Sequence, residues 1–283
     1  MNKNIFNLLQ KMEKGDDEIW GNAVTNKHQI DEHRLRENVA SIIYEDYLEE
    51  ISKHHSIEVM DAEVQKFLSR IPQDGIICDV GGCWGWHWRN LNIFRPDIQV
   101  IIIDFSRGNL THARNFLKNQ IGINIHLVHG DATAIEFHND CFDAYWTVQT
   151  LQHIPNLDKA ILEAYRILKP GACFYNYSLN NALLIKLIYK IFNKPYEDEG
   201  MVGNNFFLRR ANKKQADLIA SIFKNKVKQE FSEILFKPEF KMCFMGKENS
   251  ITGKFDSKLT GNIPLLSLIA RQQSFYTYKP RLA

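Results

Sequence analysis

The sequence predicts an α/β fold, a three-layer sandwich in which helices cover both faces of a mostly parallel sheet. Short apolar runs, typical of strands buried on both faces, lie at residues 76–80, 98–103, 123–129 and 142–148. Helix-patterned stretches separate these runs, and such alternation is typical of a parallel sheet. The first run also ends in a glycine-rich turn at the start of a helix, which favours a ligand site at that point.

Composition sets the broad class of the protein. The 283 residues suffice for one large α/β domain with additions or for two small domains, and 45% of them are hydrophobic. The net charge of +2 argues against a dedicated nucleic-acid binder. Charge is nevertheless uneven, because residues 11–50 carry a balance of −6 and residues 183–247 a balance of +6. The basic segment either steers an anionic substrate or forms a solvated face.

Cysteine usage and the N-terminus bear on the compartment. The five cysteines are odd in number and form no C-x-x-C motif, and Cys78 and Cys173 lie in apolar runs, so reduced core thiols are expected. No apolar segment of about 7–15 residues stands near the N-terminus, and no run approaches about 18 apolar residues. We therefore expect a cytoplasmic protein.

The glycine-rich turn reads Asp-Val-Gly-Gly-Cys-Trp-Gly over residues 79–85. A dinucleotide fingerprint requires glycine at its first, third and sixth positions, but counting from Gly81 the third and sixth are Cys83 and Trp86, which disfavours an NAD-dependent enzyme. The turn instead resembles motif I of the class I S-adenosylmethionine-dependent methyltransferases, an acidic and a hydrophobic residue followed by G-x-G-x-G. Cys83 stands in place of the middle glycine, and its side chain narrows the approach to the methionine moiety. A glycine-rich turn without a ligand is the alternative.

Further cofactor contacts follow from this resemblance. Asp104 ends the second strand 19 positions beyond Gly85, where a carboxylate can accept both ribose hydroxyls. The sequence Gly-Asp-Ala at residues 130–132 matches the stretch that contacts adenine in the family, although a helix N-cap is the alternative role of its aspartate. The implied cofactor-binding residues are Asp79, Gly81, Gly82, Cys83, Trp84, Gly85, Asp104, Phe105, Asp131, Ala132, Thr147, Val148 and Gln149. The implied cofactor is S-adenosylmethionine, with S-adenosylhomocysteine as its product.

A second family string, Arg-Ile-Leu-Lys-Pro-Gly at residues 166–171, closely matches R-x-L-K-P-G-G, with Ala172 for the last glycine. In the family it turns the chain into the fifth strand, expected here at residues 173–177. The resemblance, to methyltransferase type 11 in particular, covers residues 70–180 and extends weakly to the C-terminus. It implies a seven-stranded sheet of order 3-2-1-4-5-7-6 with the last strand antiparallel. The last two strands are expected at 227–236 and 274–279.

The resemblance also divides the chain into three segments. Residues 1–70 are expected to form a helical N-terminal cap, with helices over 31–53 and 60–71, residues 71–180 the S-adenosylmethionine-binding core, and residues 181–283 the rest of the sheet with substrate-side insertions. Trp20, His28 and Arg34 in the cap are candidates to touch the methionine end or the substrate, with packing and surface charge as the alternative.

Candidate catalytic and substrate residues lie beyond the fourth strand. His153 is the candidate general base, since neutral imidazole accepts a proton near pH 7, and a structural role is its alternative. Arg209 and Arg210 either grip a carboxylate or phosphate or are solvated. The strongly apolar stretch 181–192 is expected to be a core helix, with contact to a membrane surface or lipid substrate as the alternative.

Several chemistries are excluded. The chain lacks the [DNS]-P-P-[YFW] motif of amino methylation on adenine or glutamine, any Pro-Cys nucleophile and any metal-ligand spacing, so we expect no nucleic-acid substrate and no metal. The predicted function is methyl transfer from S-adenosylmethionine to a small or medium acceptor. The expected reaction is O-methylation of a sugar, glycolipid or other metabolite. N-methylation of an amine, or a degenerate S-adenosylmethionine-binding module, are the alternatives. No stable membrane insertion is expected, although peripheral contact is compatible with the sequence.

Overall fold

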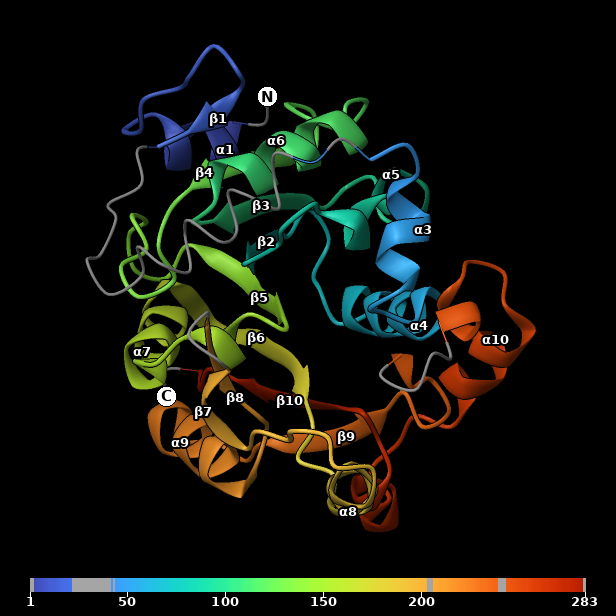
Figure 1. The fold of residues 1–283 in the computed structure, drawn as a ribbon. Helices are drawn as coiled ribbons and strands as arrows, with labels where there is room; N and C mark the ends of the chain where they lie inside the picture. The colour runs from blue at the N-terminus through green and yellow to red at the C-terminus, as the bar shows by residue number, and fades with distance from the viewer. Residues whose placement is uncertain (1–2, 22–41, 43, 203–205, 239–242, 282–283) are drawn as a thin grey trace.

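The centre of the protein is an eight-stranded sheet in the order β1-β4-β3-β2-β5-β6-β10-β9 (Figure 1). The computed structural model describes residues 3–21, 42, 44–202, 206–238 and 243–281. The strands of the sheet are β1 (Ile19–Trp20), β2 (Ile76–Val80), β3 (Gln99–Asp104), β4 (Ile125–His129), β5 (Phe142–Val148), β6 (Leu168–Leu179), β9 (Lys228–Ser232) and β10 (Gln272–Tyr278). A separate antiparallel pair consists of β7 (Glu199–Val202) and β8 (Phe206–Arg209).

The predicted strand order is confirmed for the seven strands that the sequence identified. They correspond to β2, β3, β4, β5, β6, β9 and β10, so the order β4-β3-β2-β5-β6-β10-β9 is the expected 3-2-1-4-5-7-6. The last strand, β10, runs antiparallel to both β6 and β9, as expected. Strands β2 and β3 are buried along their whole length, which explains their uninterrupted apolar sequences.

The eighth strand corrects the expectation that residues 1–70 are helical. β1 pairs in parallel with β4, with Ile19 opposite Leu127, and so forms one edge of the sheet. A strand of two residues is too short to show any periodicity, so its pairing could not be read from the sequence.

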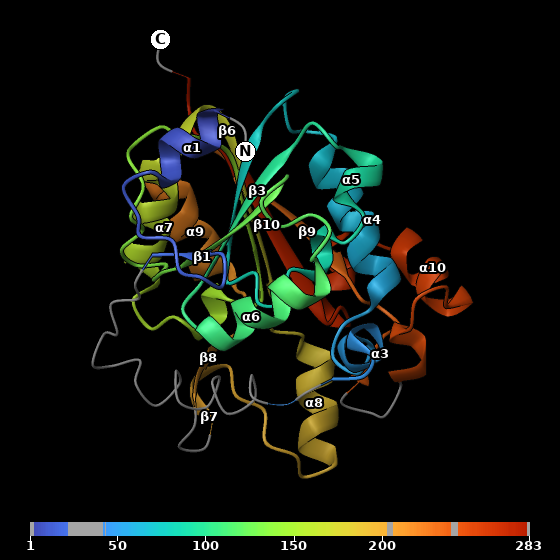
Figure 2. The ribbon, with the colours of Figure 1, turned by 90° about the horizontal axis from the view of Figure 1, so that it is seen from above.

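Helices cover both faces of the sheet (Figure 2). They are α1 (Lys3–Leu9), α3 (Tyr47–Ser52), α4 (Ile57–Leu68), α5 (Leu91–Phe94), α6 (Arg107–Phe116), α7 (Leu157–Ile167), α8 (Leu183–Ile191), α9 (Lys213–Phe223) and α10 (Ile251–Lys258), with short 3-10 turns η2 (Trp86–Trp88), η3 (Leu151–His153), η5 (Cys243–Gly246) and η6 (Pro264–Leu268). Helices α1, α7 and α9 pack into one apolar core, whereas α4 and α6 pack into the core on the other face. The three layers are therefore those of the predicted sandwich.

Local signals explain several helix and strand boundaries. Ser106 caps α6, because its Oγ accepts a hydrogen bond from the Asn109 backbone N–H at 3.2 Å. The Lys-Pro-Gly stretch after α7 belongs to the strand itself, since β6 begins at Leu168 rather than at the predicted residue 173. Gly171 adopts a φ of +84° there and donates its N–H to the Lys279 carbonyl at 2.8 Å. Glycine thus lets the chain enter the sheet directly from the helix.

The N-terminal cap is only partly described. α4 confirms the helix predicted over 60–71. The helix predicted over 31–53 is found only as α3, because the described residues 42 and 44–46 are not helical and Asp46 caps α3. His28 and Arg34 lie outside the described residues. The division at residues 70 and 180 remains a prediction, and the sheet draws strands from all three predicted segments.

Helix α8 corrects the expectation of a core helix over 181–192. Tyr189 is its one buried side chain, whereas Leu183, Leu187 and Ile191 are 63%, 52% and 70% exposed. The apolar pattern is present, but it faces away from the protein. None of the helices that the structure describes has the length and apolar character needed to cross a bilayer.

Candidate active site

A cavity of about 470 Å³ opens at the carboxyl ends of β2, β3, β4 and β5. This is the edge of the sheet where the strand order reverses, which is the usual ligand site in open α/β sheets. Its lining residues are Tyr44, Glu50, Ile51, His54, His55, Val80, Gly81, Cys83, Trp84, Trp86, His87, Ile103, Asp104, Phe105, Asn109, Gly130, Asp131, Ala132, Val148, Gln149, Thr150, His153, Ile154 and Arg271.

The glycines of the turn are required by close packing. Gly81 has a φ of +69°, and an added Cβ would overlap Oγ1 and Cγ2 of Thr150 and lie 2.6 Å from its Cβ. An added Cβ at Gly82 would lie 2.7 Å from Ile102 and 2.8 Å from the carboxyl carbon of Asp79. The turn can therefore keep this path, with Gly81 at the cavity wall, only while both positions are glycine.

Cys83 takes the conformation that favours glycine. Its φ is +51°, in the left-handed region, which costs a non-glycine residue on the order of 1 kcal/mol. Its backbone N–H donates to Asp104 Oδ2 at 2.9 Å and so ties the turn to the end of β3. The departure from the family motif is thus accommodated with the turn intact.

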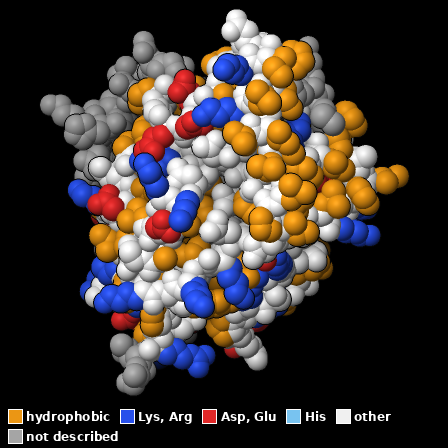
Figure 3. Space-filling model, turned by 90° about the horizontal axis from the view of Figure 1, so that it is seen from below, with side chains coloured by type: hydrophobic (Ala, Val, Ile, Leu, Met, Phe, Trp, Pro, Cys, Tyr) orange, Lys and Arg blue, Asp and Glu red, His pale blue; other side chains and the backbone are white. Residues whose placement is uncertain are grey.

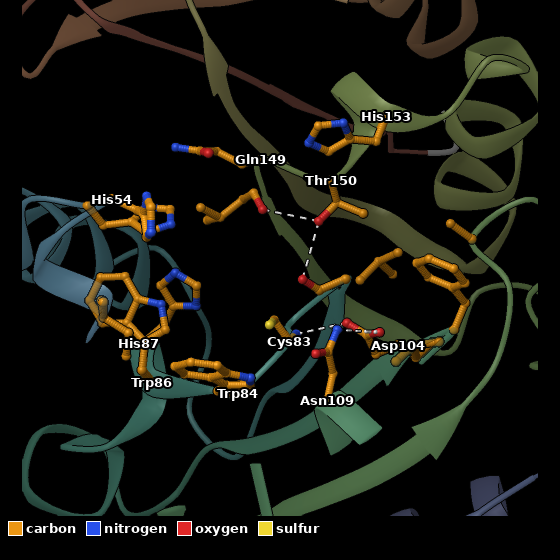
Figure 4. A pocket seen from close by; sticks show the side chains of 18 of the residues that line it. His54, Cys83, Trp84, Trp86, His87, Asp104, Asn109, Gln149, Thr150 and His153 are labelled. Carbon is orange, nitrogen blue, oxygen red and sulfur yellow. Dashed lines mark hydrogen bonds between the residues drawn. The ribbon is translucent and has the colours of Figure 1, made fainter. Parts of the chain in front are cut away.

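Asp104 is 4% exposed, and three donors hold its carboxylate at the cavity wall (Figure 4). Oδ1 accepts from the Ser106 N–H at 2.9 Å and from Asn109 Nδ2 at 3.3 Å, and the Cys83 N–H holds the other oxygen. A carboxylate fixed in this way fits the role of receiving paired hydroxyl groups.

Asp131 combines a local role with a position in the cavity wall. Its Oδ1 accepts from the Thr133 N–H at 2.8 Å and from Thr133 Oγ1 at 2.9 Å, so it stabilises the turn after β4. Both of these hydrogen bonds use Oδ1. Phe105 and Ala132 line the cavity beside it. No helix directly follows Asp131, so the helix N-cap alternative does not hold, and its bonds within the turn are compatible with the predicted ligand role.

Asp79, Gly82, Gly85 and Thr147 lie behind the wall rather than in it. Asp79 is fully buried, and its Oδ2 accepts from Trp88 Nε1 at 2.7 Å. Burial raises the pKa of Asp79 to about 7, the Trp88 bond opposes this, and the nearby charge of Asp104 adds to it. These four residues do not line the cavity, and their predicted role in cofactor binding remains a prediction.

Gln149 follows β5 and reaches the cavity with Val148. Its φ is +52°, and its backbone N–H donates to the Tyr177 carbonyl at 2.7 Å. Its side-chain Nε2 is buried with no hydrogen-bond partner among the residues that the structure describes. A strained residue with an unsatisfied amide at a cavity indicates a ligand partner.

A second lobe of the cavity, here called the imidazole lobe, consists of Tyr44, His54, His55, Trp86 and His87. In Figure 4, His54, Trp86 and His87 lie across Cys83 from Asp104. Neither ring nitrogen of the buried His87 has a hydrogen-bond partner in the described structure. Burial, assisted by the charge of Arg89, lowers the pKa of His87 to about 3. Desolvation and then Arg271 lower the pKa of the half-buried His55 well below its ordinary value. Both imidazoles are thus held in the neutral form, whose bare ring nitrogen can accept a hydrogen bond.

His153, the predicted base, lies at the cavity with both ring nitrogens engaged. Nδ1 lies 2.8 Å from the Phe207 carbonyl, so we assign the proton to this nitrogen. Nε2 then accepts from Gln152 Nε2 at 3.1 Å. This arrangement connects η3 to β8, which is the structural alternative stated for this histidine.

The predicted substrate residues Trp20, Arg209 and Arg210 do not line the cavity. The Trp20 ring packs against the apolar core, with Lys14 Nζ 5.6 Å from its centre. Arg209 donates to the Ile154 carbonyl at 3.1 Å and pairs with a glutamate of β7 at 2.9 Å. Arg210 donates to a backbone carbonyl at 2.9 Å and stacks on an aromatic ring at 4.1 Å. These partners explain why the two guanidinium groups do not face the cavity.

Sequence reasoning missed the imidazole lobe and Arg271. A sequence signal existed for part of it, since Trp86 and His87 directly follow the glycine turn. Arg271 carried no signal, because only the sheet order brings it to the cavity, where it pairs with buried Glu233 at 2.7 Å. Within the described ranges no cluster of three or more His, Cys, Asp or Glu side chains is arranged to hold a metal ion.

Comparisons with known proteins agree with this geometry. Residues 78–176 match a family model described as a methyltransferase domain. Ubiquinone/menaquinone biosynthesis C-methyltransferases UbiE are 32% identical over 95 residues in Brucella canis and 30% identical over 94 residues in Methylobacterium nodulans. Each alignment covers 33% of this chain and 35% or 37% of the relative, so the chain spans about a third of the length of these curated relatives.

Solved structures share the fold at low identity. A Thermotoga maritima protein described as an S-adenosylmethionine-dependent methyltransferase, possibly a histamine N-methyltransferase, has a TM-score of 0.58 at 15% identity over 89% of this chain and 99% of its own. The [4+2]-cyclase SpnF has a TM-score of 0.55 at 14% identity over 78% of this chain and 81% of its own. At such identities the likeness concerns the fold alone.

Proposed function

The chain belongs to the class I S-adenosylmethionine-dependent methyltransferases through its domain at residues 78–176, and we propose that it transfers the methyl group of S-adenosylmethionine to a hydroxyl of a small or medium acceptor. The observation that carries this proposal is the hydrogen bond from the Cys83 N–H to Asp104 at the cavity wall, with neutral imidazoles across the cavity.

On the cofactor side, Asp104 would receive the ribose hydroxyls and Asp131 with Ala132 the adenine. The Gly81 and Cys83 backbone would border the methionine end, and the unsatisfied amide of Gln149 would donate there. When bound, the cofactor supplies an electrophilic methyl carbon on a sulfonium. The protein then aligns the acceptor and excludes water, which accounts for much of the rate in such displacements.

On the acceptor side, the imidazole lobe offers both apolar contact and a hydrogen-bond acceptor. The rings of Tyr44 and Trp86 provide apolar walls, and the bare ring nitrogen of neutral His87 can accept a hydrogen bond from the acceptor hydroxyl and so orient it, while the hydroxyl proton is released to solvent with the products. The expectation of a sugar rested on the basic C-terminal region, whose Arg209 and Arg210 have partners within the protein. We therefore favour a hydroxylated acceptor with an apolar body, of which a glycolipid or other lipid-like metabolite is an example.

A carbon acceptor is a second candidate, because the UbiE relatives are named C-methyltransferases. N-methylation is favoured by one feature only, the tilted pair of Tyr44 and Trp84 at 4.6 Å near Glu50, which suits an ammonium group.

The test is to incubate the protein with S-adenosylmethionine and matched phenols, sugars and aryl amines, to measure S-adenosylhomocysteine by mass spectrometry, and to locate the methyl group by NMR. We expect O-methylation of phenols, and loss of roughly tenfold in kcat for His87→Phe, which cannot accept the hydrogen bond, with cofactor affinity unchanged. Turnover of amines alone would refute the hydroxyl acceptor. Cofactor binding without turnover of any compound would indicate a degenerate binding module.

A further inference from the structure

Helix α8 presents a continuous apolar surface to solvent. Five of its side chains and that of its C-cap residue share this exposure, between 37% and 70% of each: Leu183, Leu184, Leu187, Ile188, Ile191 and Phe192. Tyr189 alone is buried and anchors the helix, with its ring 5.2 Å from that of Tyr196. We call the six side chains the α8 face.

The turn η6 extends this surface. It packs beside α8, and Ile263 and Leu265 at its start are 57% and 70% exposed. Figure 3 shows the face of the protein that is seen from below. Apolar side chains gather over one half of this face, with Lys and Arg side chains beside them. Contiguous apolar patches of this kind on a folded protein mark an interaction site.

Charge around the α8 face favours an anionic bilayer as the occupant. Lys190 and Lys186, of which the latter pairs with Asp198, lie within α8, and Lys194 lies just beyond it, in a segment with a balance of +6 over residues 183–247. An amphipathic helix with apolar side chains outward and lysines at their edge is typical of helices that lie in the membrane interface. A second copy docked on the same face would bring these lysines together, which opposes self-association.

Asn180, three residues before the start of α8, connects the α8 face to the cavity. The Asn180 N–H donates to the Arg271 carbonyl at 2.8 Å, and Asn180 Nδ2 donates to the Ala270 carbonyl at 3.0 Å and the Ser267 carbonyl at 2.8 Å. Arg271 lines the cavity, and Ser267 belongs to η6. The surface and the acceptor site are thus built on the same short stretch of chain.

We propose that the α8 face docks on an anionic lipid bilayer and that the acceptor enters the cavity from that bilayer. The second half of this statement rests on the proposed function. It assigns the acceptor to molecules dissolved in lipid, whose apolar bodies suit the aromatic walls of the imidazole lobe.

The experiment is flotation of the full chain with phosphatidylcholine vesicles, with and without a minor fraction of phosphatidylglycerol. The test variant is Leu187→Asp with Ile191→Asp, and the matched control is Ile123→Asp, which is 66% exposed on the loop before β4. S-adenosylhomocysteine affinity is measured for each protein, so that loss of fold is recognised. Partitioning of the test variant should fall by at least about tenfold, since burial of one such side chain contributes more than the roughly 1.4 kcal/mol that a tenfold change represents.

Binding of the wild type to phosphatidylglycerol vesicles that the double variant loses and Ile123→Asp retains supports the proposal. Absence of vesicle binding in a protein that binds S-adenosylhomocysteine overturns it and leaves the proposed function standing. A wild-type dimer in light scattering that the double variant dissociates also overturns it, because a second copy is then the occupant. If S-adenosylhomocysteine fails to bind, the proposed function is refuted, and so is the proposal that the acceptor enters from the bilayer.

Discussion

Substitution of Gly81 with alanine isolates the packing that holds the glycine turn at the cavity. An added Cβ would overlap the Thr150 side chain, whose Oγ1 already donates to the Gly81 and Val148 carbonyls at 3.2 and 3.1 Å. The turn or Thr150 must then shift by roughly 1 Å to restore ordinary contact. Gly122→Ala is the matched control. Gly122 has a φ of +75°, close to the +69° of Gly81, so alanine is strained to a similar extent at both positions. No atom lies within 4 Å of the Cβ added at Gly122.

The two variants separate backbone strain from overlap. Alanine in the left-handed region costs about 1 kcal/mol at either position, whereas overpacking adds about 1–3 kcal/mol at Gly81 alone. We expect Gly122→Ala to lower the free energy of unfolding by about 1 kcal/mol with S-adenosylhomocysteine affinity unchanged. Gly81→Ala should lower it by about 2–4 kcal/mol and weaken that affinity at least about tenfold.

Urea unfolding gives the stability and calorimetric titration gives the affinity of each variant. Adding Thr150→Ala to Gly81→Ala removes two of the three close atoms and should restore part of both quantities. Equal stability and equal affinity for Gly81→Ala and Gly122→Ala would refute this account of the turn.

Three further predictions concern single residues. The pKa of Asp79 is about 7 when folded against an ordinary 3.8, so the folded state holds the extra proton between about pH 4 and pH 7 and wild-type stability falls as pH rises through this range. Asp79→Asn keeps an acceptor for Trp88 and should remove this fall, which amounts to at most about 4 kcal/mol in the free energy of unfolding. Urea unfolding of both proteins over this pH range tests the prediction, and parallel pH profiles of wild type and Asp79→Asn would contradict it. Cys83→Gly relieves the left-handed strain and should be more stable in urea than Cys83→Ala by up to about 1 kcal/mol; the reverse order would show that the strain is absent. His153→Asn keeps a donor for the Phe207 carbonyl and should leave kcat within about tenfold, whereas a loss of roughly 100-fold or more would assign the base to His153.

The sheet, and the position of the glycine turn and Asp104 at the cavity, were predictable because their signals are local. β2 and β3 are buried on both faces and therefore read as unbroken apolar runs, and Gly81 and Asp104 directly follow them. Residues at the ends of adjacent parallel strands necessarily meet at one edge of the sheet. Cys83 retained the turn in spite of its side chain because its N–H bond to Asp104 holds the left-handed conformation.

The imidazole lobe and Arg271, where we propose that the acceptor binds, were not predictable, because they come together only through long-range contacts. His54 and Arg271 lie more than 200 positions apart and meet only through the sheet order. Arg209 and Arg210 looked available in the sequence, but their carbonyl and carboxylate partners are visible only in three dimensions. For α8, periodicity shows that one face is apolar without showing which way that face points.

The most direct test of the cofactor site is thermal unfolding with S-adenosylhomocysteine for wild type, Asp104→Asn and the control Asp74→Asn. Asp74 is exposed before β2, at the end of the strand away from the cavity. Ligand at about 100 times its dissociation constant stabilises a binding protein by about 2.7 kcal/mol, which is readily seen as a shift in Tm. We predict this shift for wild type and Asp74→Asn, and its loss in a folded Asp104→Asn. A folded wild type whose Tm does not change would contradict the assignment of the cavity to S-adenosylmethionine.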